Sequence, residues 1–324
     1  MRILFLDSVH EYLWSHLDRM GWQCESDFES DRPAILNCIG DYEGIVIRSR
    51  LKLDAEMLLA AKNLKFIARA GSGMEGVDEA TAKGLGIHCF NAPEGNRDAV
   101  AEHAIGMLLS LFNKINTADR EVRRGEWNRE ANRGAELLGR TVGIIGYGNT
   151  GYSFAKRLAG FGVLAYGYDK YKKSFADNYV IEVDMQTILD EAEVVSLHVP
   201  LTEETHHMIN DDFFNRLANP IYLINTSRGP VVDTEALVRA LENGKVSGAC
   251  LDVLENEKAS FENIDNEDLP ASVQYLLDSN KVILTPHVAG WTMESNIKLS
   301  QVLVEKIRRI FSDQGVPQED QADH

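Results

Sequence analysis

The sequence predicts an α/β protein of two domains, each built on a parallel β-sheet covered by helices. Three observations favour this class. The chain has 324 residues, which is enough for about two domains with cores of their own. Short β-branched runs alternate with helical patterns almost throughout, as they do in βαβ units. A glycine-rich pattern between a strand and a helix comes only at residue 146, after one complete α/β series.

The first hundred residues contain four short apolar runs that we expect to be strands, at residues 3–6, 45–48, 66–69 and 87–90. A long helix should follow over residues 98–115, capped by Asn96 or Asp98. Its apolar face has helical spacing and consists of Val100, Ala104, Leu108, Leu111 and Ile115. Residues 119–140 are polar and predict a connecting loop.

The second series begins at residue 141. We expect its strands at residues 142–146, 163–168, 193–198, 221–225, 247–252 and 281–285, with helices between them. A last helix should run from residue 292 to 311, and its apolar face consists of Leu299, Leu303, Ile307 and Ile310. The polar stretch 315–324 is predicted to be disordered.

This order of elements predicts a discontinuous outer domain with a second domain inserted into it. The first series needs a further helix for cover, and the last helix of the chain can supply it. We therefore assign residues 1–97 and 288–324 to the outer domain and residues 98–287 to the inserted one.

Composition narrows the possible partners. The formal net charge of −17 disfavours nucleic acids and anionic membranes, but it leaves a small anionic substrate possible. No apolar run approaches the ~20 residues of a membrane span, and Asp7 comes too early for a signal peptide. The four cysteines lie far apart, which disfavours disulfides and a metal site. We expect a cytoplasmic protein without a bound metal.

The glycine-rich pattern reads Gly146-Tyr147-Gly148-Asn149-Thr150-Gly151 and fits GxGxxG. Placed between a strand and a helix, these glycines permit a tight turn, close approach of a pyrophosphate and close helix packing. The N–H groups at the start of the helix can then bind the phosphates. Asp169 ends the next strand, 18 residues after Gly151. It is either an ordinary strand-end acid or, as this context favours, the acceptor for the adenosine ribose hydroxyls, and the expected cofactor is NAD.

Three later strands end in reactive side chains, namely Arg228, Asp252 and His287, and Glu257 follows shortly after Asp252. Each could be a solvated loop residue when taken alone. Doubly wound sheets, however, bind ligands at the carboxyl ends of their strands. Oxidation of a hydroxy acid needs a base, a group that supports the base, and a cation for the carboxylate. His287, Glu257 and Arg228 would supply these three functions.

The chain resembles the D-isomer-specific 2-hydroxyacid dehydrogenases over nearly its whole length. The resemblance is carried by ARAGSGMEGVD (68–78), NAPEGNRDAVAEHAIGMLLSL (91–111), ELLGRTVGIIGYGNTG (136–151), HVPLTEETHHMIN (198–210), INTSRGPVVDTEALVRAL (224–241), ACLDVLENE (249–257) and LTPHVAGWT (284–292). It implies that Arg228, Glu257 and His287 form the catalytic set. It also implies that backbone N–H groups at Ser72, Gly73 and Met74 meet the substrate carboxylate.

The resemblance further implies a Rossmann-type nucleotide domain inserted in a flavodoxin-like substrate domain, and a homodimer paired through the nucleotide domain. Asp252 would hold the nicotinamide amide. The implied cofactor-binding set is Gly146, Gly148, Asn149, Thr150, Gly151, Asp169, His198, Pro200, Thr205, Thr226, Ser227, Asp252 and Gly290. Two departures from the family pattern are Thr150, where an apolar residue is common, and Lys258, where a proline is usual.

Within the family, RSR (48–50), RAGSG (69–73) and EGN…AEH (94–103) look most like 3-phosphoglycerate dehydrogenases of serine biosynthesis. The expected reaction is therefore oxidation of 3-phospho-D-glycerate to 3-phosphohydroxypyruvate. Arg48 and Arg69 are the expected ligands of the phosphate, with Arg50, Arg97 or Arg129 as further candidates. The alternatives are a hydroxypyruvate or glyoxylate reductase, and a non-enzymatic NAD-sensing protein like the corepressors that share this fold.

Overall fold

The computed structural model describes residues 1–255, 257 and 269–311, so the predicted disorder of residues 315–324 lies outside the described residues. The chain divides into two compact units. The terminal unit contains Met1–Asn96 and the chain from Trp291 onward, and the central unit contains Arg97–Gly290. Arg97 and residues 288–290, which the sequence analysis gave to the outer domain, thus lie in the central unit.

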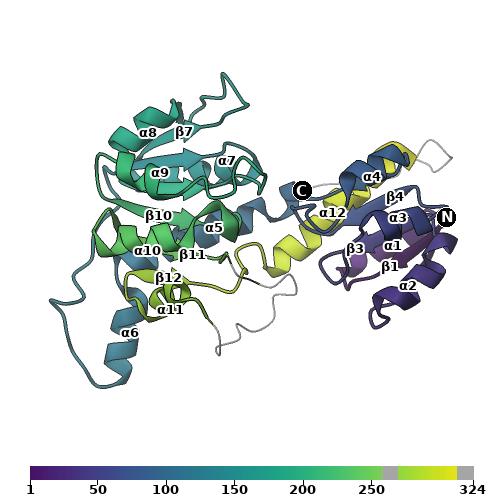
Figure 1. The fold of residues 1–324 in the computed structure, drawn as a ribbon, viewed down its shortest axis with the longest axis horizontal. Coiled ribbons are helices and arrows are strands. Elements are labelled where there is room, and N and C mark those ends of the chain that lie inside the picture. The colour runs from purple at the N-terminus through teal and green to yellow at the C-terminus, as the bar shows by residue number, and fades with distance from the viewer. Residues whose placement is uncertain (256, 258–268, 312–324) are drawn as a thin grey trace. The chain divides into compact units, whose positions relative to one another are not determined.

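The terminal unit is built on a five-stranded sheet (Figure 1). Its strands are β1 (Arg2–Phe5), β2 (Gln23–Ser26), β3 (Gly44–Ile47), β4 (Phe66–Arg69) and β5 (His88–Phe90). They are all parallel and lie in the order β2-β1-β3-β4-β5, which is the flavodoxin-like order. The helices are α1 (Glu11–Arg19), α2 (Arg32–Cys38), η1 (Ile39–Asp41), α3 (Ala55–Ala60), α4 (Glu79–Gly84) and α12 (Met293–Phe311).

Helix α12 shares a core with the first strand of the terminal unit. Its residues Leu299, Leu303 and Ile307 are buried together with Ile3 and Phe5. Ile310, which the sequence analysis placed on the same buried face, is 48% exposed. The prediction for this residue was wrong because in the last turn it is Phe311 that packs on the aromatic rings beneath.

The central unit is built on a seven-stranded parallel sheet of order β12-β11-β10-β9-β6-β7-β8. Its strands are β6 (Thr141–Ile145), β7 (Leu164–Tyr168), β8 (Ile181–Glu182), β9 (Val194–Leu197), β10 (Ile221–Asn225), β11 (Val246–Leu251) and β12 (Val282–Leu284). This is the Rossmann order with one strand added. The order reverses between β6 and β9, so the loops that follow these two strands flank a ligand-binding crevice of the usual kind.

The helices of the central unit cover this sheet (Figure 1). They are α6 (Ile115–Arg123), α7 (Asn149–Leu158), η2 (Ala159–Phe161), α8 (Met185–Glu191), α9 (Asp211–Arg216), η3 (Gly229–Val231), α10 (Thr234–Glu242) and α11 (Ala271–Asp278), preceded by α5 (Pro93–Phe112). The predicted two-domain α/β architecture is confirmed by the two parallel sheets.

Two predicted boundaries around α5 were wrong. The helix begins at Pro93 and not near residue 98, because proline suits the first turn of a helix, where its missing N–H costs nothing. Asn96 and Asp98 therefore do not cap it, and they accept hydrogen bonds from Ser72 and Ser153 instead. The predicted helix end at residue 115 is also wrong, because α5 stops at Phe112.

The predicted loop 119–140 begins with a helix that the sequence analysis missed. Helix α6 has no buried residue. Its apolar residues Ile115, Ala118 and Val122 have helical spacing, but the sequence analysis ended the preceding helix at Ile115 and assigned the polar residues that follow to a loop. Ile115, assigned to the buried face of α5, lies in α6 and is 53% exposed. Strands β2 and β8 were missed for a related reason, since both are short edge strands with polar residues.

Candidate active site

The three glycines of the GxGxxG turn each meet a different steric demand. Gly146 has φ +93°, and a Cβ on it would lie 2.4 Å from the carbonyl oxygen of His198. A Cβ on Gly151 would lie 2.1 Å from the carbonyl oxygen of Gly146. Gly148 is exposed, and nothing lies within 4 Å of where its Cβ would be. The turn is therefore tight at its first and third glycines and open at the second, as a bound pyrophosphate requires.

Helix α7 begins immediately after this turn, at Asn149, and no side chain caps its first N–H groups. Such groups bind phosphate oxygens readily. Arg97 donates from Nη1 to Oδ1 of Asn149 at 3.4 Å, so a cation lies at the same helix end. The sequence analysis considered Arg97 for the phosphate of the substrate, whereas the structure places its guanidinium at the predicted cofactor loop.

Asp169 follows β7 and receives three backbone N–H groups. Tyr147 N donates to Oδ2 at 2.9 Å, and Tyr171 N and Lys172 N donate to Oδ1 at 3.0 and 2.9 Å. Burial opposes ionisation, but these three hydrogen bonds outweigh it and lower the pKa of Asp169. The carboxylate is thus held ionised next to the glycine-rich turn, where a 2′-phosphate would meet its charge.

The loop after β9 contains three of the residues predicted to bind cofactor. The imidazole of His198 is buried, with Nε2 2.8 Å from Ser196 Oγ and its ring against Phe154. Its side chain is thereby enclosed, and a cofactor contact at this position falls to the backbone. Thr205 Oγ1 donates to the carbonyl of Pro200 at 2.6 Å and gives the loop a fixed shape.

The turn after β10 is organised by the side chain of Asn225. Its Oδ1 accepts from the N–H and the hydroxyl of Ser227, at 3.0 and 2.8 Å, and its Nδ2 donates to the carbonyl of Arg228 at 2.9 Å. A Cβ on Gly229 would lie 2.0 Å from the carbonyl oxygen of Leu254. The turn that carries Arg228 therefore packs directly on the segment that leads from Asp252 to Glu257.

Thr226, in the same turn, provides a test of whether a bound cofactor fits this edge of the sheet. Its Oγ1 is buried and has no hydrogen-bond partner within the part of the chain that the structure describes. A buried hydroxyl without a partner is costly, so this oxygen is set to bind a group that the chain itself does not contain. Together with the open space at Gly148, it fits NAD laid along the carboxyl ends of β6, β9 and β10.

Asp252, at the end of β11, is almost fully buried and holds the segment on either side of His287. Its Oδ1 accepts from the Thr285 hydroxyl at 2.5 Å and from Val288 N at 2.9 Å, and its Oδ2 accepts from Ala289 N at 2.9 Å. These bonds occupy three of about four acceptor positions of a carboxylate. The geometry therefore gives Asp252 a role in positioning this segment that the sequence analysis did not foresee.

His287 and Glu257 form the pair that the sequence analysis predicted. Nδ1 of His287 lies 3.1 Å from Glu257 Oε2 and 3.2 Å from Oε1. The backbone of His287 has φ +55°, an uncommon and strained value for a residue other than glycine. Its N–H donates to the carbonyl of Asp252 at 2.8 Å, which helps to hold the strained conformation. Nδ1 thus faces the Glu257 carboxylate.

In the terminal unit, the residues predicted to bind substrate follow β3 and β4. Arg69 donates from Nε to the carbonyl of Arg48 at 3.2 Å, so the two arginines lie at neighbouring strand ends. The guanidinium of Arg48 lies 4.0 Å from the ring centroid of Trp291, and it has no hydrogen-bond acceptor among the described residues. Arg50 differs, because its guanidinium donates to the carbonyls of Leu6, Asp27 and Ser30. These bonds tie Arg50 to its own unit and make it a weaker candidate for the phosphate than Arg48.

The loop after β4 has the backbone donors that the family resemblance implied. Within the described residues, the N–H groups of Ser72, Gly73 and Met74 have no hydrogen-bond acceptor. Ser72 itself is fixed by two bonds, because its hydroxyl donates to Asn96 Oδ1 and its carbonyl accepts from Asn91 Nδ2, both at 2.6 Å. A fixed loop with successive unoccupied N–H groups is suited to binding an anion.

Residues 1–255, 257 and 269–311 contain no group of three or more His, Cys, Asp and Glu side chains arranged to hold a metal ion. Over the same residues, no helix combines the length and the apolar character that crossing a membrane would require.

Comparison with known proteins decides the family. A family model described as the NAD binding domain of D-isomer specific 2-hydroxyacid dehydrogenases matches residues 105–289, more than half of the chain. The chain belongs to this family. The resemblance inferred from the sequence is thereby confirmed, and so is NAD as the cofactor.

Relatives within the family differ in substrate and in length. The chain is 36% identical to D-3-phosphoglycerate dehydrogenase of Archaeoglobus fulgidus, and the match covers 95% of this chain and 56% of that protein. It is 38% identical to hydroxypyruvate reductase of Thermotoga maritima, over 86% of this chain and 87% of that protein. The chain thus spans about half the length of the first relative and most of the second.

A solved structure in the same family is also similar. It is the D-lactate dehydrogenase of Aquifex aeolicus, crystallised with NAD and lactic acid, which is 28% identical and has a TM-score of 0.81. The match covers 97% of this chain and 96% of that one.

Sequence reasoning missed one residue at the central site. His103 Nε2 lies 3.0 Å from Thr285 Oγ1, so it extends the hydrogen bonds that run from Thr285 to Asp252. Outside this site, in the terminal unit, sequence reasoning also missed that Trp291 covers the guanidinium of Arg48. A helix histidine facing a strand end could have been noticed from the AEH sequence, but no spacing rule predicts the contact of Trp291 with Arg48.

Proposed function

We propose that this protein is an NAD-dependent D-2-hydroxyacid dehydrogenase whose substrate is 3-phospho-D-glycerate. The observation that carries the activity is the His287–Glu257 pair, 3.1 Å apart, at the carboxyl edge of the sheet that bears the glycine-rich turn. The observation that carries the phosphate is the Arg48 guanidinium in the terminal unit, which has no acceptor among the described residues.

Bound NAD would supply the hydride acceptor for C2 of the substrate. Gly146, Gly148, Gly151 and the first N–H groups of α7 would hold its pyrophosphate, and Asp169 its adenosine ribose. As the C2–H bond breaks, Nε2 of His287 takes the proton of the 2-hydroxyl group. Glu257, beside Nδ1, stabilises the imidazolium that results. The products are a 2-oxo acid, NADH and a proton that His287 returns to solvent.

The two anionic ends of 3-phospho-D-glycerate need separate cations or donors. We assign the carboxylate to Arg228 and to the N–H groups at residues 72–74, because a guanidinium and a row of amides both suit a planar anion. We assign the phosphate to Arg48 and Arg69. Arg129, which is exposed in the segment after α6, stays a further candidate from a second subunit.

A second candidate is hydroxypyruvate reduction, and sequence identity is what favours it. The chain is 38% identical to the hydroxypyruvate reductase of Thermotoga maritima and 36% identical to the phosphoglycerate dehydrogenase of Archaeoglobus fulgidus. In this case Arg48 would bind an unphosphorylated substrate weakly, and discrimination between the two substrates would be small.

Steady-state kinetics with 3-phospho-D-glycerate, D-glycerate, hydroxypyruvate, glyoxylate and D-lactate, each with NAD(H) and NADP(H), tests the proposal. We expect the highest kcat/KM for 3-phospho-D-glycerate with NAD. Preference for hydroxypyruvate would select the second candidate. Turnover of none of these acids, with NADH still bound tightly, would indicate a dinucleotide-sensing protein.

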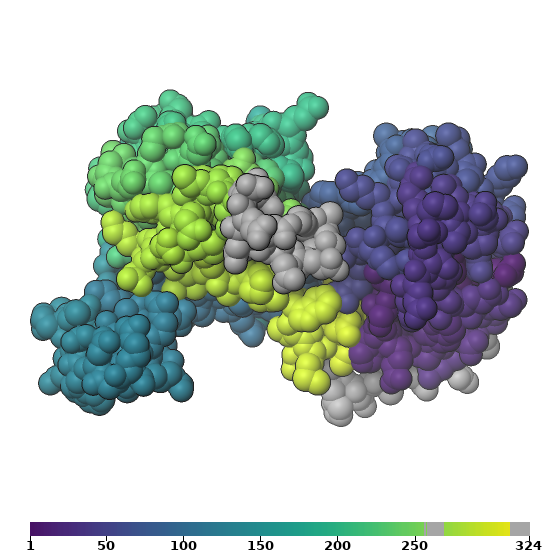
Figure 2. All heavy atoms as spheres, turned by 60° about the horizontal axis from the view of Figure 1, so that its bottom comes forward, coloured from purple at the N-terminus to yellow at the C-terminus, as the bar shows by residue number. Residues whose placement is uncertain are grey.

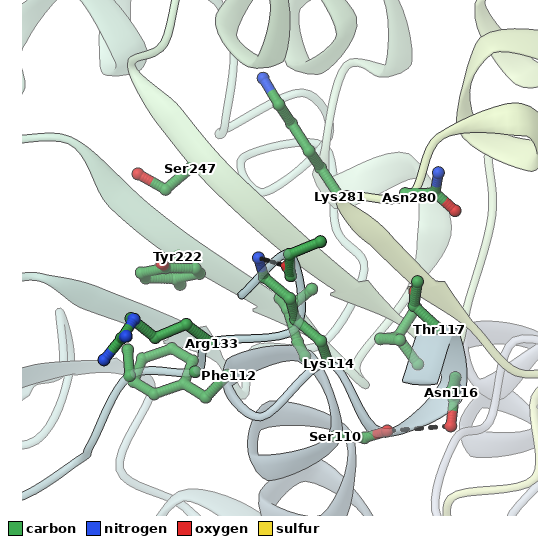
Figure 3. Close-up of a pocket in the computed structure, with 15 residues that line it drawn as sticks. Ser110, Phe112, Lys114, Asn116, Thr117, Arg133, Tyr222, Ser247, Asn280 and Lys281 are labelled. Atoms are coloured by element: carbon green, nitrogen blue, oxygen red, sulfur yellow. Dashed lines mark hydrogen bonds between the residues drawn. The ribbon is translucent and has the colours of Figure 1, made fainter. Parts of the chain in front are cut away.

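We propose further that the chain forms a homodimer through the arm that follows α5. Helix α6 and the residues after it project from the central unit (Figure 1, Figure 2). Two large apolar side chains in the residues after α6 are mostly exposed, Trp127 at 76% and Leu138, shortly before β6, at 71%. A cavity of about 550 Å³ lies at the base of the arm, lined by Phe112 and Lys114 and by residues near the starts of β10 and β11 (Figure 3). An arm with exposed apolar side chains beside a hollow on one chain allows two copies to exchange the same contacts about a twofold axis.

Sedimentation equilibrium tests the dimer. We expect a dimer at micromolar concentration, and we expect Trp127→Ser to weaken its association at least tenfold because a large apolar side chain loses its partner. Leu59→Ser, which alters a leucine of similar exposure on α3, is the matched control and should leave association unchanged. A monomeric wild-type protein would refute this proposal.

A further inference from the structure

Trp291 is the residue outside the family site whose placement most needs a physical explanation. It is 65% exposed, although a large aromatic side chain normally gains by burial. Its main recorded contact is with the guanidinium carbon of Arg48, 4.0 Å from the ring centroid. This is well within the distance at which a cation is attracted to an aromatic ring, and tryptophan is the best ring for this purpose.

The backbone at Trp291 is fixed by the start of α12. Thr292 N donates to Ser295 Oγ and Ser295 N donates to Thr292 Oγ1, both at 3.0 Å. This reciprocal cap holds the first turn of the helix, so the backbone next to Trp291 is fixed without a ligand.

Arg48 is fixed from the other side through its backbone. Its N–H donates to Asp7 Oδ2 at 2.6 Å, and its carbonyl accepts from Arg69 Nε at 3.2 Å. Burial lowers the pKa of the Arg48 guanidinium, with the charge of Asp7 opposing this effect. The cation thus loses water without gaining a hydrogen-bonded partner among the described residues, which is costly unless an anion binds it.

The guanidinium carbon of Arg48 lies over the Trp291 ring, and its N–H groups have no hydrogen-bond acceptor among the described residues. The N–H groups of a guanidinium point outward in its plane and match two oxygens of one anion. We propose that Trp291 is a specificity-determining residue that holds the Arg48 guanidinium ready for the phosphate of the substrate. This inference rests on the proposed function for the identity of the substrate, but its ring–cation contact can be tested separately.

The kinetic test compares Trp291→Phe with Trp291→Leu. A cation–ring contact of this kind corresponds to roughly 2- to 30-fold in affinity. We expect Trp291→Leu to raise KM for 3-phospho-D-glycerate roughly 5- to 30-fold, with kcat and the KM for D-glycerate within twofold of wild type. Trp291→Phe keeps a ring and should recover most of the loss. Met293→Ala, which alters an exposed apolar side chain two residues away, is the control and should change nothing.

Fluorescence gives a test that does not need turnover. Titration with inorganic phosphate and with 3-phospho-D-glycerate should change the tryptophan emission of the wild-type protein in a saturable way, and the change should be lost in Trp291→Phe and Arg48→Ala. D-glycerate should not produce it. If the enzyme oxidises only unphosphorylated acids but this signal is present, the substrate assignment fails and the role of Trp291 stands. The proposal would be overturned if Trp291→Phe kept the fluorescence change. It would also be overturned if Trp291→Leu raised KM equally for 3-phospho-D-glycerate and D-glycerate.

Discussion

The two parallel sheets of this protein differ in how the residues at their carboxyl edges are satisfied. In the central unit, Asp252 has three hydrogen bonds at its carboxylate and Glu257 lies against His287. In the terminal unit, Arg48 has no acceptor for its guanidinium among the described residues, and neither have the N–H groups of residues 72–74. At the central edge the groups assigned to proton transfer are bonded within the chain, whereas at the terminal edge the groups assigned to the substrate anion are donors that a ligand must satisfy.

This difference suggests how proton transfer and anion recognition can be assigned to two similar folds. Groups that move a proton must be oriented before the substrate arrives, and internal hydrogen bonds provide that orientation. Groups that recognise an anion gain more when their partner is the anion itself. We therefore expect substitutions at the central edge to lower kcat, and substitutions at the terminal edge to raise KM for anionic substrates.

The largest effect is expected for His287→Ala. Loss of the proton acceptor should lower kcat roughly 10²- to 10⁴-fold, because acid–base assistance is worth about that much. The dissociation constant for NADH, measured by fluorescence, should stay within about threefold of wild type. If the variant kept most of its turnover, His287 would not be the proton acceptor. The assignment of proton transfer to the central edge would then be wrong.

Arg48→Ala should have the next largest effect, on KM and not on kcat. Charge-assisted bonds to phosphate are worth roughly 1.5–3 kcal/mol, which corresponds to roughly 10- to 150-fold in KM for 3-phospho-D-glycerate. Kinetics with D-glycerate provide the control, because this acid lacks the phosphate and its KM should hardly change. An equal loss with both acids would mean that Arg48 supports the fold of the edge and does not select the phosphate.

Thr285→Val tests whether Asp252 orients His287. The substitution removes the 2.5 Å bond from the Thr285 hydroxyl to the carboxylate, and we expect kcat to fall roughly 10-fold with little change in KM for NAD. Thr81→Val is the matched control, since Thr81 donates to Asp78 at 2.7 Å at the start of α4. Equal kcat in Thr285→Val and wild type would show that the strained backbone of His287 needs no such support.

The sequence predicted the contact of His287 with Glu257 and the glycine-rich turn, but it missed several elements around them. Such residues are recognised because their chemistry restricts which residue types can serve. Helix α6 was missed because it is short and largely polar and none of its residues is buried. The hydrogen bonds of Asp252 were not predicted, since only the folded chain shows which N–H groups meet a carboxylate. The bonds of Arg50 were not predicted for a similar reason, because a strand-end arginine can equally bind backbone carbonyls.

The smallest expected effect concerns stability, at His198 in the central unit. Burial lowers the pKa of its imidazole to about 3, against ~6.5 in an unfolded chain. Between these pH values the unfolded chain binds a proton there and the folded chain does not, so stability is lost as the pH falls from about 6.5 toward 3. At pH 5 this group should lower the free energy of unfolding by about 2 kcal/mol relative to pH 7.

Urea denaturation of wild type and His198→Gln at both pH values measures this effect. The variant should lose about 2 kcal/mol less than wild type between pH 7 and pH 5. An identical loss in both proteins would mean that the His198 ring is protonated in the folded state, contrary to its enclosure by Ser196 and Phe154.

We assign anion recognition to the terminal edge and proton transfer to the central edge. Combining Arg48→Ala with His287→Ala tests this separation most directly. Effects at independent sites multiply, and free energies add within about 0.3–0.5 kcal/mol. The measurement is kcat/KM of wild type, both single variants and the double variant, with 3-phospho-D-glycerate and NAD. We predict that the double variant loses the product of the two single losses, within about twofold. A double variant no worse than His287→Ala alone would show that the two residues act as one unit, and the separation of recognition from chemistry would be wrong.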